Sequence, residues 1–153
     1  MIAHSPSDRK KKGTQELIEA VEALKKDGYD IELDIIEGVS YLESIARKKN
    51  ALLFYDQSLT GFYGNASIEA MALGVPTMCR MDEKAYARSG GKLDNCPVLD
   101  TKEGLKEAIA SYLDRKDKAS LSEKTARFVK KTHSYESVSV MWDIIYKTLL
   151  NDK

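Results

Sequence analysis

The spacing of apolar residues along this chain predicts strands and helices in alternation. The uninterrupted apolar run from Ala51 to Phe54 is typical of a strand that is buried on both faces. Between Tyr29 and Glu37 apolar and acidic residues alternate in part, which predicts a strand nearer the edge of a sheet. A helix is predicted from Thr14 to Asp27. Its apolar residues recur on one face: Leu17, Ile18, Val21 and Leu24.

The other segments extend this alternation to both ends of the chain. Further strands are predicted at residues 1–4, 76–79 and 97–99, and further helices after Ser40, before Gly74, and at 101–113, 118–131 and 134–150. The polar, glycine-bearing segment 81–95 is predicted to be a loop. The last helix is expected to bury its apolar residues: Val138, Met141, Trp142, Ile145 and Leu149. The whole order predicts an α/β fold, a Rossmann-like, doubly wound, mostly parallel sheet with flanking helices.

Two loops of this predicted fold carry residues that suit a phosphate group. Ligands of such sheets bind at the carboxyl ends of the strands, and the loops after His4 and after Phe54 both lie there. The second loop contains Gly64 and leads into a helix. A strand, a glycine loop and a helix N-terminus together form a place for an anion, because the first amides of the helix point at it. Asn65 belongs to that first turn, either as an amide donor or as the N-cap.

A longer stretch resembles the nucleotide-sugar site of retaining, GT-B-fold glycosyltransferases of the large family 4. Residues 61–76 read G-F-Y-G-N-A-S-I-E-A-M-A-L-G-V-P. The family's pattern is E-G-F-G-x-x-x-x-E-A-M-A-x-G-x-P, so the match includes Gly64, Glu69 and Pro76. It departs at Gly61, where the family has a glutamate that is usually placed against the donor sugar or its phosphates. The resemblance continues into the loop after His4, where Arg9 and the Lys12-Gly13 pair match a basic segment of the family.

The resemblance implies roles for five residues. Arg9 and Lys12 would hold the donor diphosphate, together with backbone at Gly64 and Asn65, and Glu69 would accept hydrogen bonds from the ribose hydroxyls. Fixed cations suit this chemistry, because a departing nucleoside diphosphate gains negative charge in the transition state. Simpler interpretations stay open. The basic segment is also typical of a solvated loop, and a glutamate near a helix start also interacts with the helix dipole.

Five more residues are candidates for lining the same cleft. His4, Asp56 and Gln57 follow strand ends directly, while Gly61 and Tyr63 lie in the glycine loop. Each has a structural alternative: a buried histidine, a loop anchor that bonds neighbouring backbone, or an aromatic ring that fills space. No residue is assigned a catalytic role, because the chain has no nucleophile elbow, zinc-protease motif or full Walker loop.

Composition narrows the class of protein. The chain has 153 residues, a length that is enough for one domain over residues 1–153. Its 24 basic and 24 acidic side chains balance, and this lack of a basic surplus argues against general nucleic-acid binding. It has no apolar segment long enough for a transmembrane span. Two cysteines, Cys79 and Cys96, are too few for a disulfide framework or a metal site. A cytoplasmic location is expected, with the parent protein either free there or peripheral at the membrane.

In that family the two domains enclose the active site between them, and this chain is similar to the C-terminal, donor-binding one. The resemblance therefore implies a piece of a longer protein that lacks the N-terminal acceptor-binding domain. The parent would transfer a sugar from a UDP- or GDP-sugar to an acceptor hydroxyl without metal or cofactor, and the isolated domain would be inactive. A sugar-nucleotide epimerase half-domain is one alternative. A non-catalytic nucleotide-binding or interaction module is another, and a flavodoxin-like signalling domain with Asp56 as its acidic residue is a third.

Overall fold

The structure, a computed structural model, describes residues 1–88 and 96–151. The end of the segment expected to be a loop, residues 89–95, lies outside the described residues. The elements are β1 (Ile2–His4), α1 (Thr14–Lys26), β2 (Leu33–Ile35), α2 (Tyr41–Lys49), β3 (Leu53–Tyr55), α3 (Asn65–Ala72), β4 (Thr77–Cys79), α4 (Glu83–Arg88), β5 (Leu99–Asp100), α5 (Leu105–Leu113), α6 (Lys118–His133) and α7 (Tyr135–Asn151).

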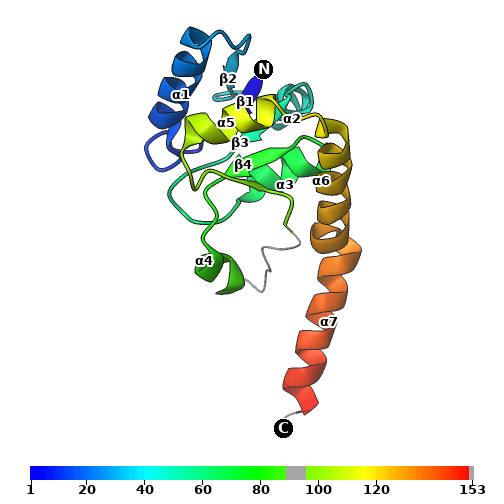
Figure 1. Cartoon of the computed structure of the whole chain (residues 1–153). Helices are drawn as coiled ribbons and strands as arrows, with labels where there is room; N and C mark the ends of the chain where they lie inside the picture. Colours follow the sequence, from blue (N-terminus) through cyan, green and yellow to red (C-terminus); the bar gives the residue numbers. More distant parts are fainter. Residues whose placement is uncertain (89–95, 152–153) are drawn as a thin grey trace.

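The five strands form one sheet in the order β2-β1-β3-β4-β5 (Figure 1). All four neighbouring pairs are parallel, which confirms the predicted Rossmann-like, doubly wound fold. The chain passes from β1 outward to β2 and then returns to the other side of β1 to form β3. The topological switch point therefore lies between β1 and β3, and this is where sheets of this kind bind ligands.

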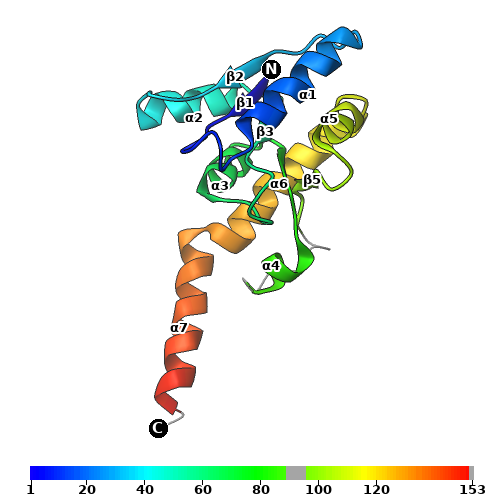
Figure 2. The ribbon, with the colours of Figure 1, turned by 90° about the vertical axis from the view of Figure 1, so that its left-hand side faces the viewer.

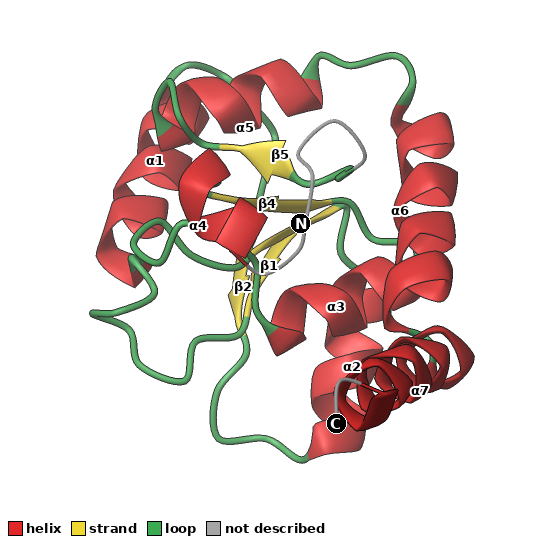
Figure 3. Cartoon of the chain, turned by 90° about the horizontal axis from the view of Figure 1, so that it is seen from below, coloured by secondary structure: helices red, strands yellow, loops and turns green. Residues whose placement is uncertain are grey.

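Helices cover both faces of the sheet, as the view from below shows (Figure 3). Helices α1 and α5 pack on one face, against a core that includes Ile2, Leu53 and Met78. Helix α3 packs on the other face, where Ala3 and Phe54 are buried. Helix α6 lies against α3, and its Leu121 also belongs to the core under α1 and α5. The central strand β3 is buried on both faces, as its continuous apolar run predicts.

Two local predictions were wrong. Residues 81–88 are not all loop, because α4 begins just after Asp82, whose carboxylate accepts a hydrogen bond from the Ala85 amide at 2.7 Å. This is the local bond of a helix N-cap, and it favours a helix over a loop. The edge strand β2 is also shorter than the predicted segment of residues 29–37.

The exposure of α7 overturns the prediction that this helix buries its apolar face. Met141 is 51% exposed, Trp142 49% and Leu149 61%. Figures 1 and 2 show why, since α7 leaves the body and projects beyond it, with α6 as its main neighbour. The helical spacing of apolar residues is real, but it does not supply a surface to pack against. Within the described part of the chain, no helix is long and apolar enough to cross a membrane.

Candidate functional site

The loops after β1 and β3 meet at the topological switch point through Lys12 and Asp56. The Lys12 ammonium donates to Asp56 Oδ1 at 2.7 Å and to Gln57 Oε1 at 3.2 Å. Asp56 and Gln57 are buried directly after β3, whereas Lys12 is half-buried in the loop before α1. The structure thus brings together three of the predicted residues, which are 44 and 45 positions apart in the chain.

The second oxygen of Asp56 lies at the start of α3. Asp56 Oδ2 accepts hydrogen bonds from the Gly64 amide and from the Ser67 hydroxyl, both at 2.6 Å. Gly64 is the N-cap residue of α3, so the alternative that placed Asn65 there was wrong. An internal carboxylate therefore already satisfies the Gly64 amide, which was expected to meet a phosphate.

Other donors remain at this end of α3. The Ser67 and Ile68 amides bond to the Gly64 carbonyl, at 3.0 and 3.2 Å. The amides of Asn65 and Ala66 have no acceptor among the described residues. Lys12 keeps one of its three N–H donors, and its nitrogen would lie 3.6 Å from a Cβ placed on Gly64. The switch point thus offers one ammonium donor and two amides of a helix N-terminus to an anion.

Glu69 is held by a lysine that the sequence did not single out. Lys48 reaches from the last turn of α2 and donates to Glu69 Oε2 at 2.5 Å. Its nitrogen also lies 5.6 Å from the centre of the Phe54 ring, and its side chain is almost fully buried. Glu69 belongs to the second turn of α3, so a simple interaction with the helix dipole at the first turn does not explain it. A lysine in the last turn of a short helix gives no sequence signal of burial, because most lysines there face water.

Glu69 also lines a groove of about 520 Å³ between α2, α3 and α6. Apolar side chains such as Ile45, Ile68 and Val129 form most of its wall, and Lys130 and His133 line it from the end of α6. The free oxygen of Glu69 is therefore an acceptor next to an apolar surface. Such a site suits a ligand with hydroxyl donors beside an apolar body.

Arg9 lies apart from this cluster. Its guanidinium bonds Glu37 at 2.5 to 3.0 Å on the surface, and this contact lowers the pKa of Glu37 below its ordinary value. Glu37 follows β2, so Arg9 bridges two neighbouring loops at the carboxyl edge of the sheet. Arg9 is exposed, and exposed ion pairs of this kind are weak and easily exchanged.

His4 has a structural position below the site. Its Nδ1–H donates to the Tyr55 carbonyl at 3.0 Å, and its Nε2 accepts from the Thr14 hydroxyl at 2.8 Å. The ring is fully buried, and this burial lowers its pKa. His4 therefore joins β1, β3 and α1 as a neutral imidazole rather than lining an open cleft.

Tyr63 fills space between α4 and α6. Its hydroxyl bonds His133 Nε2 at 3.0 Å and the Tyr86 hydroxyl at 3.3 Å, and its ring packs edge-on against Phe128. The loop before α3 is thereby tied to α4 and to the end of α6. His133 is half-buried in this cluster, and burial lowers its pKa.

Gly61 has a backbone conformation and surroundings that oppose any side chain at this position. Its φ is +77°, and a Cβ at this position would lie 2.9 Å from the Asp82 Cβ, closer than carbon atoms approach. Its carbonyl also accepts from the Asp82 amide at 2.7 Å, just before α4. The family's first glutamate is therefore incompatible with this loop and α4 as they stand.

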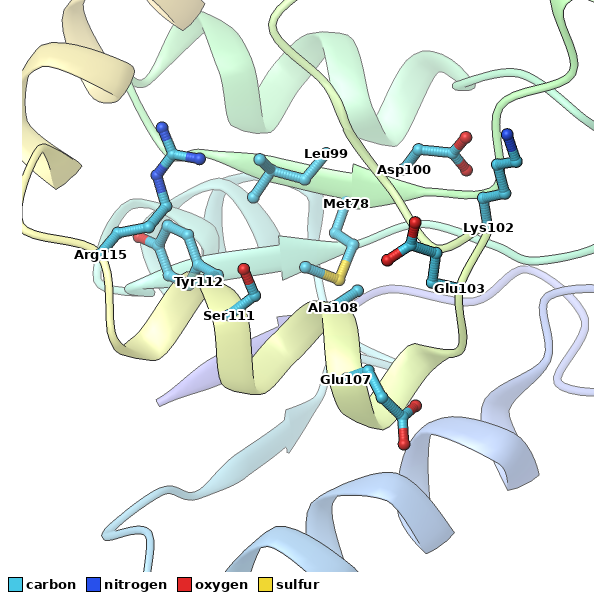
Figure 4. A pocket seen from close by; sticks show the side chains of 10 residues that line it. All are labelled: Met78, Leu99, Asp100, Lys102, Glu103, Glu107, Ala108, Ser111, Tyr112 and Arg115. Carbon is cyan, nitrogen blue, oxygen red and sulfur yellow. The ribbon is translucent and has the colours of Figure 1, made fainter.

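A separate hollow lies at the edge of the sheet formed by β5, between β5 and α5 (Figure 4). It has a volume of about 270 Å³, with Met78 at its floor, Arg115 at one end and Lys102 at the other. Its lining comes from β4, β5 and α5 and their flanking residues, so it is independent of the switch point. Among residues 1–88 and 96–151, no three His, Cys, Asp or Glu side chains converge as metal ligands do.

Neither a protein-family model nor a curated protein matches this chain.

Proposed function

We propose that this domain binds the nucleoside diphosphate of a UDP- or GDP-sugar, as the C-terminal donor domain of a retaining GT-B glycosyltransferase. One observation carries the proposal, the convergence of the Lys12 ammonium with the first amides of α3 at the topological switch point. The resemblance of residues 61–76 to the family's donor site supports the same assignment.

Two parts of the donor, the diphosphate and the ribose, have counterparts in this proposal. The free N–H of Lys12 and the amides of Asn65 and Ala66 bind the diphosphate and stabilise the charge that it gains when the bond to the sugar breaks. The free oxygen of Glu69 accepts from the ribose hydroxyls. Arg9 gives up its exposed ion pair with Glu37 to bind the diphosphate.

A second, acceptor-binding domain is part of this proposal. Helix α7 leaves the body on the side where α4 lies, and α4 follows the carboxyl end of β4 (Figure 1). The exposed apolar residues of α7 therefore extend beyond the edge of the sheet that holds the switch point. A domain that closes over the donor would find this apolar surface beside it, and large exposed apolar patches mark such interfaces.

A non-catalytic nucleotide-binding module is a second candidate, and Gly61 favours it. The steric limit at this position removes the carboxylate that the family places against the donor sugar. A module of this kind would bind the nucleotide and ignore the sugar. Titrations with UDP, with GDP and with their glucose conjugates separate the two candidates, because only the donor domain would bind the conjugates differently from the free nucleotides.

Calorimetric and NMR titration tests the proposal directly. Lys12→Gln should weaken binding of the preferred nucleotide at least tenfold, since a hydrogen bond to a charged group contributes about 1.5 to 3 kcal/mol. Glu69→Gln should weaken it less, because the amide keeps an acceptor oxygen. Lys11→Gln is the matched control, since the Lys11 side chain is exposed and should leave affinity within about twofold of wild type. No binding of UDP or GDP at millimolar concentration would contradict the proposal.

A further inference from the structure

We infer that Asp56 is a positioning residue of this site, which holds the Lys12 ammonium and the start of α3 in the arrangement that receives a diphosphate. The inference rests on the proposed function and assigns a role that the resemblance does not include. Asp56 stands directly after β3, at the level where two loops come together.

The two oxygens of Asp56 serve different elements. Oδ1 accepts from Lys12, which belongs to the loop between β1 and α1. Oδ2 accepts from the Gly64 amide and the Ser67 hydroxyl, which belong to α3 and its N-cap. One buried carboxylate thus sets the distance between the cation and the helix N-terminus, the two features that a diphosphate would contact.

Lys12 needs such an anchor, because a lysine has a long flexible side chain that otherwise follows solvent. Gln57 provides a second fixed point, since its Oε1 accepts from Lys12 while its Nε2 donates to the Phe62 carbonyl at 2.5 Å. The backbone of Gln57 is in turn held by the Arg80 amide at 2.8 Å. The end of β3 therefore determines where the Lys12 nitrogen lies before any ligand arrives.

Asp56 acts through these groups rather than on the ligand. Its carboxylate is buried, and a phosphate placed against it would meet a like charge. Gly64 fits the same arrangement, since a Cβ there would lie 3.3 Å from Asp56 Oδ2 and crowd the carboxylate at the start of α3. The small residue thus serves the internal carboxylate as well as an approaching ligand.

This role predicts an effect whose sign opposes simple electrostatics. Asp56→Asn removes a negative charge beside an anion site, so charge alone would make inorganic pyrophosphate and UDP bind more tightly. Loss of positioning makes them bind more weakly, and we expect about a tenfold loss, similar to that of Lys12→Gln. In the Lys12→Gln background the same change should add less than about twofold, because Asp56 acts mainly through Lys12.

Ser67→Ala is the matched control, since it removes one contact of the same carboxylate and leaves Lys12 in place. It should stay within about twofold of wild type. Circular dichroism and thermal melting establish that each variant is folded. A second readout needs no ligand: the ¹⁵N-bound protons of the Lys12 ammonium should exchange slowly enough to be seen by NMR in wild type and be lost in Asp56→Asn, whereas those of Lys11 stay unseen in both.

The outcomes separate this inference from the proposed function. If wild type binds none of pyrophosphate, UDP and GDP, the proposed function fails and the inference fails with it. If wild type binds and a folded Asp56→Asn binds equally or more tightly, only the inference is overturned. If Asp56→Asn does not fold, the inference is tested on Asp56→Glu and by the NMR signal of the Lys12 ammonium. Absence of that signal in wild type overturns the inference.

Discussion

Two lysine–carboxylate pairs flank α3, and their burial is reversed. At the start of the helix the carboxylate of Asp56 is 1% exposed and the Lys12 side chain is 18% exposed. In the second turn the Lys48 side chain is 3% exposed and Glu69 is 30% exposed. The N–O distances are alike, 2.7 and 2.5 Å, so the pairs differ in which member is turned toward water.

This reversal decides what each pair offers to a ligand. The first presents an ammonium donor, while the second presents a carboxylate acceptor. The elements that carry the buried members explain the difference, since Asp56 follows the central strand β3 and Lys48 lies over the ring of Phe54. In the proposed function, the cation at the start of α3 would bind the phosphates and the acceptor one turn later would bind the ribose. When one member of an ion pair is buried, it can thus hold the other member in a fixed position that is open to water.

The largest expected effect removes the exposed member of the second pair. Glu69→Ala leaves the Lys48 ammonium buried and unpaired, and should lower the free energy of unfolding by about 3 kcal/mol in urea titrations. Lys48→Met is the control. It removes the buried charge and leaves Glu69 facing water, so it should stay within about 1 kcal/mol of wild type. Equal losses in both variants would contradict the assigned asymmetry.

The second prediction concerns a carboxylate introduced at position 61, in the loop before α3. Gly61→Glu introduces the residue that the glycosyltransferase pattern resembled by residues 61–76 has at this position, but the left-handed backbone and the Asp82 side chain oppose it. We expect the free energy of unfolding to fall by about 2 to 3 kcal/mol. Gly38→Ala is the control, since Gly38 also has a positive φ but has nothing within 4 Å of a Cβ. A Gly61→Glu protein as stable as that control would show that the loop adapts.

The pH dependence of stability tests the neutral imidazole below the first pair. Burial lowers the pKa of His4 in the folded protein below the value of 6.5 expected when unfolded. Between these two values the unfolded chain binds more protons, so acidification favours unfolding. The contribution of neutral His4 to the free energy of unfolding is complete above pH 6.5. Below pH 6.5 it falls by at most about 1.4 kcal/mol per pH unit. Urea titrations from pH 7.5 to 5.5 should show a shallower decline for His4→Gln; an unchanged slope would contradict this role.

The smallest expected effect is a change in the pKa of His4, which we use to compare the two pairs. After burial and its bond to Tyr55, the His4 pKa responds to the charges of Asp56, which raises it, and Lys12, which lowers it. Lys12→Gln should therefore raise the His4 pKa measured by NMR titration, whereas Lys48→Met should leave it unchanged. A shift of the His4 pKa in Lys48→Met would show that the second pair also acts electrostatically on His4.

Much of the fold followed from local patterns. Every predicted strand is present, and the helices at residues 14–26 and 118–133 begin where they were expected. The loops after His4 and Phe54 were also correctly assigned to one edge of the sheet, because parallel strands place their carboxyl ends together. The errors have two different causes. At Asp82 a local N-cap starts a helix inside an expected loop. In α7 the apolar spacing is present, but the helix projects from the body and has little surface to pack against.

By itself, the sequence determined the alternation of strands and helices, and it placed the loops that carry Lys12, Asp56 and Gly64 at one edge of the sheet. Only the tertiary structure decided how these groups are paired. Lys12 pairs with a carboxylate 44 residues away in the chain, and Glu69 pairs with a lysine 21 residues away. Neither separation along the chain is set by strand or helix periodicity. Pairing depends on which side chains the packed elements bring within about 3 Å of each other. Packing also excludes a side chain at Gly61 and leaves α7 exposed.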